Sequence, residues 1–290
     1  MDLANVFQTA IVRVNGIRMY YRWMGDGPLL VLLHGWPQTG YCWRHLMAPL
    51  SAAYTVIAPD LRGYGRSDKP TSGHDKRMRA EDLHQLIRSL GHESATVIGH
   101  DRGARVAHRW ALDYPADVER LVLMDIIPTR EMWRRMDKDL ASGTWHWLFH
   151  LQPDLPELLS GANPAGYLRY FLDRWTHVPL PEEDIAEYVR AFSAPGAMRA
   201  GFDDYRASFP LDAEHDDADY GRKIAMPVKL LWGEHSFLHK IDALEIWRDY
   251  AKNVTGAVIE QCGHFLAEER PDRVLEILGG FLPRLTRTAM

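Results

Sequence analysis

The residues best suited to chemistry lie in one short window, Gly99-His100-Asp101-Arg102-Gly103. The apolar run ATVIG enters this window and helix-like sequence follows, so Asp101 is predicted at a sharp strand-to-helix turn. Glycines two residues to either side let the chain turn tightly and push the central side chain into a cavity. The pattern predicts that the Asp101 carboxylate is a nucleophile. A plainer alternative is that Asp101 only caps the helix.

A carboxylate nucleophile points to displacement at saturated carbon, because it needs no deprotonation and leaves an alkyl ester on Asp101. Hydrolysis of that ester requires a base for water and donors for the oxyanion. His264, in a loop after the strand-like GAVIE, is the predicted base. The backbone N–H groups of Trp36, in the turn HGWP, and of Arg102, directly after the nucleophile, are the predicted oxyanion hole.

A base histidine needs a third group that fixes its tautomer. Two carboxylates follow strand-like runs and compete for this position. Asp125 ends VERLVLMD and is the predicted acid, whereas Glu234, in Gly233-Glu234-His235-Ser236 after MPVKLLWG, is the rival. A third reading makes Asp125 a turn carboxylate.

Two arginines stand in the first turn of the helix after Asp101. Arg102 and Arg105 are three residues apart and share a helix face, where the helix dipole disfavours cations, so a compensating anion is expected. Asp101 could be that anion, but a substrate carboxylate suits the guanidinium fork better. Both arginines are therefore predicted to bind a substrate carboxylate, with a structural salt bridge as the alternative for Arg105.

The elements that must position these residues alternate along the chain. Their apolar character is continuous rather than alternating, which indicates strands buried on both faces of a parallel sheet covered by helices. The predicted strands are VFQTAIVRV and IRMYYRWM, joined as a hairpin, followed by PLLVLLHG, YTVIAPD, SATVIGHD, VERLVLMDI, MPVKLLWG and GAVIEQCG. The predicted helices that cover the sheet are 42–52, 76–90, 103–113, 240–251 and 271–284.

One long interval interrupts this alternation. Between Asp125 and Met226 the sequence is helix-like and rich in Trp and Pro, with no comparable strand run. We expect a core of residues 1–128 and 221–290 and an inserted helical cap of residues 129–220. A cap over the carboxyl ends of the strands would close a pocket where α/β sheets bind ligands.

Composition excludes several functions. Among 290 residues, 34 are basic and 39 acidic, which gives a net charge of −5 with no clustered basic stripe, so no nucleic acid is expected as a partner. Neither a membrane-spanning run nor a signal peptide is seen, which predicts a cytoplasmic protein with no membrane partner. Cys42 and Cys262 are expected to be reduced and buried. No cofactor or metal is expected.

The motifs together resemble the fluoroacetate (haloacetate) dehalogenases of the α/β-hydrolase fold. These motifs are HGWPQTG, DLRGYGRSD, GHDRGARVAHR, MDIIPT, TWHWLFHLQP, DDYRAS and CGHF, which extend over about residues 30 to 270. The fold class is therefore α/β, with a mostly parallel eight-stranded sheet, helices on both faces and an inserted helical cap. The paired arginines of DRGAR and the HW of the cap are the specific parts of the resemblance.

The resemblance implies a role for each matching position. Asp101 matches the nucleophile, Asp125 and His264 the acid and base, and Arg102 and Arg105 the carboxylate clamp. In the cap, it implies that His146, Trp147 and Tyr205 donate hydrogen bonds to the departing halide. It also implies a homodimer. Trp36 stands where the family commonly has Phe, and the turn GEHS differs from the family's small residues.

Three functions follow as hypotheses. The leading one is hydrolytic dehalogenation of a short 2-haloacid by way of an aspartyl ester. The alternative is an epoxide hydrolase of the same fold, for which the cap tyrosines Tyr167, Tyr170, Tyr188 and Tyr205 are available. The third is a non-enzymatic ligand receptor. The absence of a G-x-S-x-G pattern disfavours a serine esterase.

Overall fold

The computed structural model describes residues 7–283, and its centre is one eight-stranded sheet. The strand order is β1-β2-β4-β3-β5-β6-β7-β8, with β1 and β2 antiparallel to their neighbours and the remaining pairs parallel. The strands are β1 Gln8–Val14, β2 Ile17–Met24, β3 Leu29–Leu33, β4 Thr55–Pro59, β5 Ala95–His100, β6 Val118–Met124, β7 Val228–Gly233 and β8 Val254–Ile259. The predicted fold class is confirmed.

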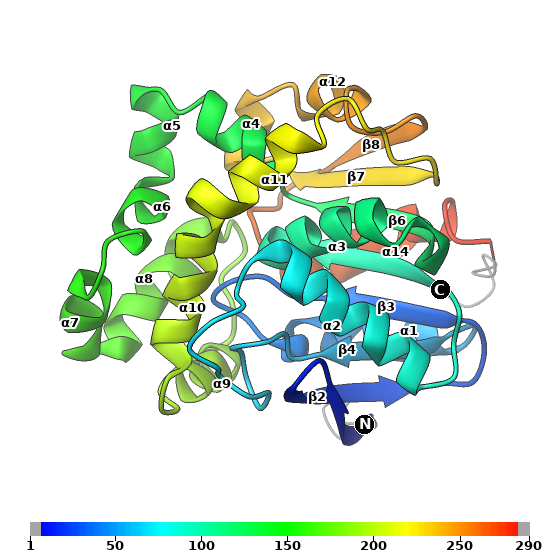
Figure 1. Cartoon of the computed structure of the whole chain (residues 1–290), viewed down its shortest axis with the longest axis horizontal. Coiled ribbons are helices and arrows are strands. Elements are labelled where there is room, and N and C mark those ends of the chain that lie inside the picture. Colours follow the sequence, from blue (N-terminus) through cyan, green and yellow to red (C-terminus); the bar gives the residue numbers. More distant parts are fainter. Residues whose placement is uncertain (1–6, 284–290) are drawn as a thin grey trace.

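Helices cover both faces of the sheet (Figure 1). The helices around the sheet are α1 Arg44–Ser51, α2 Lys76–Ser89, α3 Asp101–Asp113, α12 Ala243–Arg248, α13 Leu266–Glu269 and α14 Pro271–Gly279, with short turns η2 Gly40–Trp43, η3 Pro115–Asp117 and η5 Phe237–Lys240. Residues of β3 alternate between two cores. Leu29, Val31 and Leu33 pack on the side of α2 and α3, whereas Leu30 and Leu32 pack on the side of α1 and α14.

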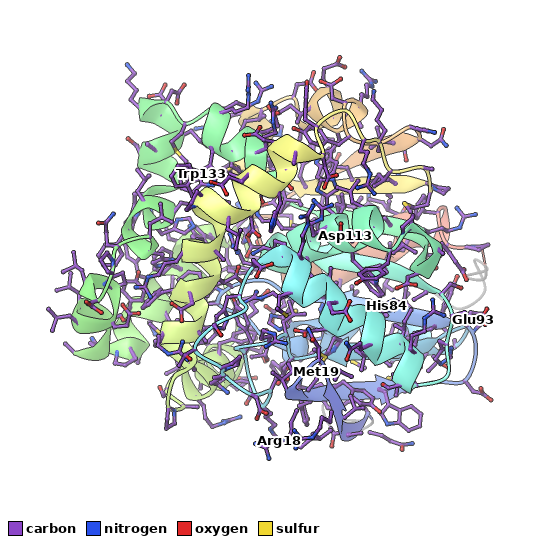
Figure 2. The ribbon with its side chains drawn as sticks, viewed as in Figure 1. Arg18, Met19, His84, Glu93, Asp113 and Trp133 are labelled. Atoms are coloured by element: carbon purple, nitrogen blue, oxygen red, sulfur yellow. The ribbon has the colours of Figure 1, made fainter. Side chains whose placement is uncertain are left out.

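The outer antiparallel strands are less completely buried: β1 has an exposed face, and β2 has one exposed residue. Arg18 and Met19, both labelled in Figure 2, are neighbours in β2. Met19 is fully buried, whereas Arg18 reaches the surface and pairs with Asp68 at 2.9 Å. Every residue of β3 and β5 is buried, as their continuous apolar runs predict, and burial on both faces extends to residues 20–22 of β2.

Several predicted helices differ from the observed ones at their ends. The helix expected over 103–113 begins at Asp101, so the predicted nucleophile is its first residue. The helix expected over 240–251 covers only Ala243–Arg248, because the Asp242 side chain caps it by accepting from the N–H of Glu245. Val6, at the start of the first predicted strand, and residue 284, at the end of the last predicted helix, lie outside the described residues.

A second group of helices lies between β6 and β7. It comprises α4 Thr129–Arg134, α5 Lys138–Gly143, α6 Trp145–His150, α7 Leu155–Gly161, α8 Pro164–Trp175, α9 Glu182–Phe192, α10 Ala197–Ala207, η4 Ser208–Asp212 and α11 Ala213–Ala218. In Figure 1 the parallel strands point their carboxyl ends toward these helices. The exact division into core and cap at residues 128/129 and 220/221 stays a prediction.

Cys42 and Cys262 are free and buried, as expected. Within residues 7–283, no helix has the length and apolarity needed to cross a lipid bilayer.

Helix α3 approaches β3 so closely that one position accepts only glycine. A Cβ on Gly103 would lie 2.4 Å from the backbone oxygens of both Leu33 and His34. These atoms belong to the central strand and its turn and cannot move aside independently. The close packing of α3, which carries Asp101 at its start, depends on this glycine.

We therefore predict that Gly103→Ala lowers the free energy of unfolding by about 1–3 kcal/mol, the usual cost of overpacking. The measurement is chemical denaturation followed by circular dichroism. Gly161→Ala is the control, because a Cβ on Gly161, at the end of a cap helix, meets nothing within 4 Å. Equal stability of the two variants would contradict the prediction.

Candidate active site

The predicted nucleophile lies in a strained turn between β5 and α3. Asp101 has a positive φ of 47°, a conformation that costs a non-glycine residue energy and is common at functional positions. Its side chain is buried, and Oδ1 accepts a hydrogen bond of 2.9 Å from the backbone N–H of Trp36. The pairing of Leu33 with Gly99 between β3 and β5 brings the HGWP turn to this position.

The structure thus brings one predicted oxyanion donor, the Trp36 N–H, onto the predicted nucleophile. The Arg102 N–H belongs to the first turn of α3, where backbone donors have no partner within the helix. Burial raises the pKa of Asp101, but the nearby His264, His100 and Arg102 outweigh it, so the pKa lies below its ordinary value. Asp101 is therefore ionised at neutral pH.

The predicted base and acid form a direct pair. Asp125 follows β6 as Asp101 follows β5, and His100 pairs with Met124 in the register of the two strands. Nδ1 of His264 lies 2.5 Å from Oδ2 of Asp125. Nε2 of His264 is buried and has no hydrogen-bond partner among the described residues. With Nδ1–H donated to Asp125, the Nε2 lone pair is left to accept a proton.

The rival acid, Glu234, lies elsewhere. Its carboxylate accepts from the backbone N–H of Gln261 at 2.9 Å and lies 3.6 Å from His235. Burial lowers the pKa of His264, but the hydrogen bond and charge of Asp125 outweigh this effect, so its pKa is raised above 6.5. Burial also raises the pKa of Asp125, against the hydrogen bond from His264. The geometry favours Asp125 over Glu234 as the partner of the histidine.

The two arginines have different surroundings. Arg102 is fully buried, and its Nε donates to Oδ1 of Asp204 at 3.0 Å while Nη2 donates to the Asp204 backbone oxygen at 2.7 Å. The anion expected beside Arg102 is thus a cap carboxylate. Arg102 does not line the cavity that contains Asp101. Binding of a substrate carboxylate by both arginines stays a prediction. The pairing of Arg102 with Asp204 does not favour it for Arg102.

Arg105 lines the cavity, and its acceptors are neutral. Nη1 donates to the Ile127 backbone oxygen at 2.8 Å and lies 3.3 Å from Oγ1 of Thr129. Both of these acceptors are neutral oxygens, and no ion pair of Arg105 with a carboxylate is found within residues 7–283, so the salt bridge considered as its alternative role is not observed. Burial and the neighbouring Arg102 lower the pKa of Arg105 to about 10, which leaves it charged at neutral pH. The charges of Asp101 and Asp216 oppose this lowering, but neither carboxylate is hydrogen-bonded to Arg105, so its guanidinium is a favourable place for a bound anion.

The three cap residues implied by the resemblance lie together. Ring centroids of Tyr205 are 5.6 Å from His146 and 5.7 Å from Trp147. His146 and Trp147 line the cavity, and Tyr205 packs beside them without lining it. Burial lowers the pKa of His146 to about 3, so the imidazole is neutral, and its buried Nδ1 has no partner among the described residues. A neutral N–H of this kind is a suitable donor to a small anion.

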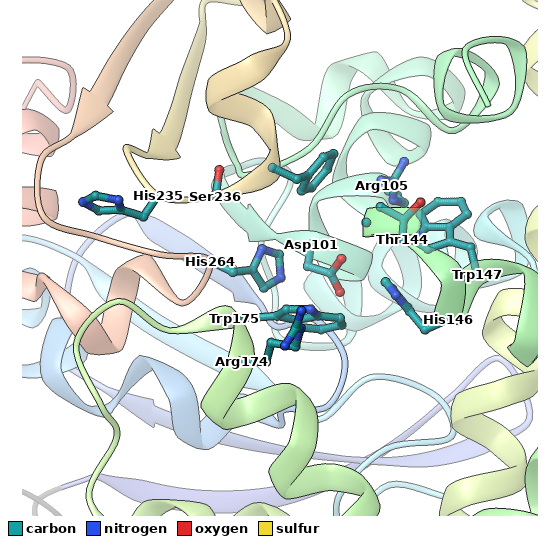
Figure 3. Close-up of a pocket in the computed structure, with 12 residues that line it drawn as sticks. Asp101, Arg105, Thr144, His146, Trp147, Arg174, Trp175, His235, Ser236 and His264 are labelled. Carbon is teal, nitrogen blue, oxygen red and sulfur yellow. The ribbon is translucent and has the colours of Figure 1, made fainter. Parts of the chain in front are cut away.

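One cavity of about 110 Å³ joins the core and cap residues (Figure 3). Within it, Asp101 lies between His264 on one side and His146 and Trp147 on the other. The lining residues are Asp101, Arg105, Gly143, Thr144, His146, Trp147, Arg174, Trp175, His235, Ser236, Phe237 and His264. A cavity of this size fits a small molecule.

Sequence reasoning missed several of these residues. Trp175 packs against His264, with ring centroids 5.3 Å apart, and its neighbour Arg174 also lines the cavity. No spacing rule identifies them, because they lie at the end of a cap helix. The pairing of Asp204 with Arg102 was also missed. The expectation of an anion near Arg102 was a signal that could have prompted a search for such a carboxylate.

One group of possible metal ligands lies outside this cavity. Asp75, Asp212 and His215 place one ligand atom each within 4.8 Å of one another. Nζ of Lys76 lies 3.3 Å from Oδ2 of Asp212 and already supplies positive charge there. This group does not favour a metal over the existing ion pair.

Comparison with known proteins identifies the family to which this protein belongs. A family model for the alpha/beta hydrolase fold matches residues 28–271, and the chain belongs to this family of hydrolases. It is 42% identical over 269 residues to a soluble epoxide hydrolase of Corynebacterium sp. (strain C12), covering 91% of this chain and 93% of that protein. It is 35% identical over 286 residues to a fluoroacetate dehalogenase of Burkholderia sp, covering 95% and 94%.

The solved structure of the epoxide hydrolase CorEH is similar over the whole length, with a TM-score of 0.90, 38% identity and coverage of 97% of this chain and 100% of that one. The protein is therefore a hydrolase of the alpha/beta fold, and its relatives differ in the bond they cleave.

The His264–Asp125 pair predicts a pH dependence. The pKa of His264 in the folded protein lies above 6.5, the ordinary value that it has in the unfolded chain. The contribution of this ion pair to the free energy of unfolding is therefore complete below pH 6.5 and is lost as the pH rises through the folded-state pKa of His264. We predict that Asp125→Asn lowers the His264 pKa, measured by NMR titration of the ring. Glu234→Gln is the matched control and should leave that titration unchanged; the reverse result would assign the acid to Glu234.

Proposed function

We propose that this hydrolase removes halide from short 2-haloacids such as haloacetates. The observation that carries the proposal is the position of Arg105, a buried cation that lines the cavity beside Asp101 and has only neutral acceptors. A substrate carboxylate would give the Arg105 guanidinium a hydrogen-bonded anion and hold the α-carbon near Asp101. The small cavity and the neutral N–H donors of His146 and Trp147 support the same substrate class.

In the proposed first step, an Asp101 oxygen attacks the carbon that bears the halogen. The carbon–halogen bond breaks with its electron pair, so halide leaves and an ester joins the substrate to Asp101. The halide departs on the side opposite the attacking oxygen. His146, Trp147 and Tyr205 are the proposed donors that stabilise it as charge develops.

In the second step, water hydrolyses the ester at the Asp101 carbonyl. Nε2 of His264 accepts a proton from water, and Asp125 stabilises the resulting imidazolium. The backbone N–H groups of Trp36 and Arg102 are the proposed donors to the oxyanion. When this intermediate collapses, the ester C–O bond breaks and the departing alkoxide takes the proton from the His264 imidazolium, which releases the 2-hydroxyacid and restores neutral His264. The Asp101 carboxyl group, which now contains one water oxygen, loses its proton to solvent and is again a carboxylate. No cofactor takes part in the proposed cycle.

The second candidate is epoxide hydrolysis, which the 42% identity to a soluble epoxide hydrolase favours. In that reaction cap tyrosines would activate the epoxide oxygen. Of the four cap tyrosines considered for this role, Tyr167 is hydrogen-bonded to His150 at 2.6 Å, Tyr188 donates to Glu268 at 2.8 Å and Tyr170 is 44% exposed. Tyr205 packs against the lining residues His146 and Trp147, and the ring centroid of Tyr170 lies 5.8 Å from the guanidinium carbon of the lining residue Arg174. None of these four tyrosines lines the cavity itself, which supports the haloacid substrate over an epoxide.

We expect halide release from chloroacetate or fluoroacetate, measured with an ion-selective electrode, and no diol from styrene oxide. Asp101→Asn is the blank and should release no halide. Diol formation from styrene oxide without halide release from any haloacetate would make the protein an epoxide hydrolase. Binding of carboxylates with neither reaction would favour the receptor.

The covalent step has its own test. His264→Asn should form the ester and fail to hydrolyse it, so intact-mass spectrometry after incubation with chloroacetate should find the mass of one carboxymethyl group added. In ¹⁸O-labelled water, the first turnover of the wild type should give unlabelled product, because its oxygen comes from Asp101. Label in that first product would contradict an aspartyl ester.

A further inference from the structure

Asp204, a carboxylate of the cap helix α10, is the centre of a buried charge cluster. Its side chain has no exposed surface and accepts from Arg102 Nε at 3.0 Å, Lys76 Nζ at 2.5 Å and Tyr64 Oη at 2.7 Å. Arg79 also pairs with it. Burial raises the pKa of Asp204, but Arg102, Arg79 and Lys76 outweigh it and hold the pKa well below its ordinary value. A buried carboxylate with these partners has a fixed position.

All these partners belong to the core side of the structure. Lys76 and Arg79 lie in α2, Arg102 lies in the first turn of α3, and Tyr64 lies in the loop after β4. Asp204 therefore ties α10 directly to the helix that begins with Asp101. The next residue along α10 is Tyr205, whose ring centroid lies 4.4 Å from the Arg102 guanidinium carbon.

The same guanidinium also lies 5.3 Å from the Trp147 ring centroid, and that of Arg105 lies 4.6 Å from it. Tyr205 and Trp147, two of the residues proposed to receive halide, thus pack on the arginines of α3. Arg102 donates to both the carboxylate and the backbone oxygen of Asp204, which fixes the guanidinium that contacts both rings.

Resting on the proposed dehalogenation, we infer that Asp204 is a positioning residue for the leaving group. It holds Tyr205 and Arg102 at a fixed place relative to Asp101, so that the halide donors lie beyond the carbon under attack. Asp204 itself touches neither substrate nor the reacting atoms. Errors of about 1 Å in such an arrangement cost roughly 10²-fold in rate.

Leaving groups differ in how much they need these donors. Chloride holds its charge in a smaller volume than bromide and gains more from hydrogen bonds as it departs. Displaced donors should therefore slow the release of chloride more than the release of bromide. A purely structural loss of folded protein would lower both rates by the same factor.

The test compares single-turnover halide release from chloroacetate and bromoacetate, with enzyme in excess. For Asp204→Asn we expect a loss of about 100-fold with chloroacetate and about 10-fold with bromoacetate. Tyr64→Phe removes one hydrogen bond to Asp204 without changing charge, and should shift the ratio of rates in the same direction by less. If Asp204→Asn does not fold, the inference is tested with Tyr64→Phe instead.

Asp184→Asn is the matched control, because it breaks another buried cap–core ion pair. Asp184 lies in α9 and pairs with Arg44 and with Tyr41, the latter at 2.8 Å, away from the halide donors. We expect this variant to keep the wild-type ratio of chloride to bromide release. Equal losses for both halides in the Asp204 and Tyr64 variants, or a shifted ratio in Asp184→Asn, would overturn the inference alone. A wild type that releases neither halide would overturn the proposed function itself.

Discussion

The rest of the site depends on keeping one buried carboxylate ionised. Burying a charge is costly unless other groups compensate for it, and Asp101 is compensated from several directions. The Trp36 N–H donates to it, and it is the first residue of α3, where the helix dipole favours a negative charge. His264 and Arg105 line the same cavity. Each of these groups also has a place in a reaction that passes through an ester. The surroundings that keep the nucleophile charged are thus the ones that would serve the intermediate.

The arginines of α3 divide this electrostatic task. Arg102 has a permanent anion in Asp204, so it contributes to holding the cap against the core. Arg105 has backbone and hydroxyl acceptors only, so its charge stays available in the cavity. Identical side chains one turn apart therefore differ in function because of one carboxylate on another element.

The sheet and the core half of the site could be predicted because their signals are local. Continuous apolar runs define the inner strands, and the glycines around Asp101 define the turn. Parallel strands then bring Asp101 and Asp125 to one edge, since His100 and Met124 are paired. The choice between Asp125 and Glu234 needed coordinates, because both follow strands at that edge.

The cap residues of the site could not be predicted from local sequence signals. Trp175, Arg174 and Asp204 act through tertiary contacts between helices, and no periodicity specifies which helix faces the cavity. The pairing of Arg102 illustrates the difficulty. Sequence reasoning correctly required an anion near this arginine, but the residue that supplies it lies about a hundred positions away.

The insertion point of the cap has an evolutionary consequence. Strands β6 and β7 are direct neighbours, with Leu121 opposite Val228, although the whole helical segment separates them in the chain. The segment adds no strand to the sheet, so the pairing of β6 with β7 does not depend on it. Mutations in cap residues that do not pair with the core, as Asp204 does, can therefore accumulate without changing the pairing of the strands. A lineage could change the substrate that it accepts while inheriting the same sheet, and relatives named as an epoxide hydrolase and as a fluoroacetate dehalogenase are the expected result.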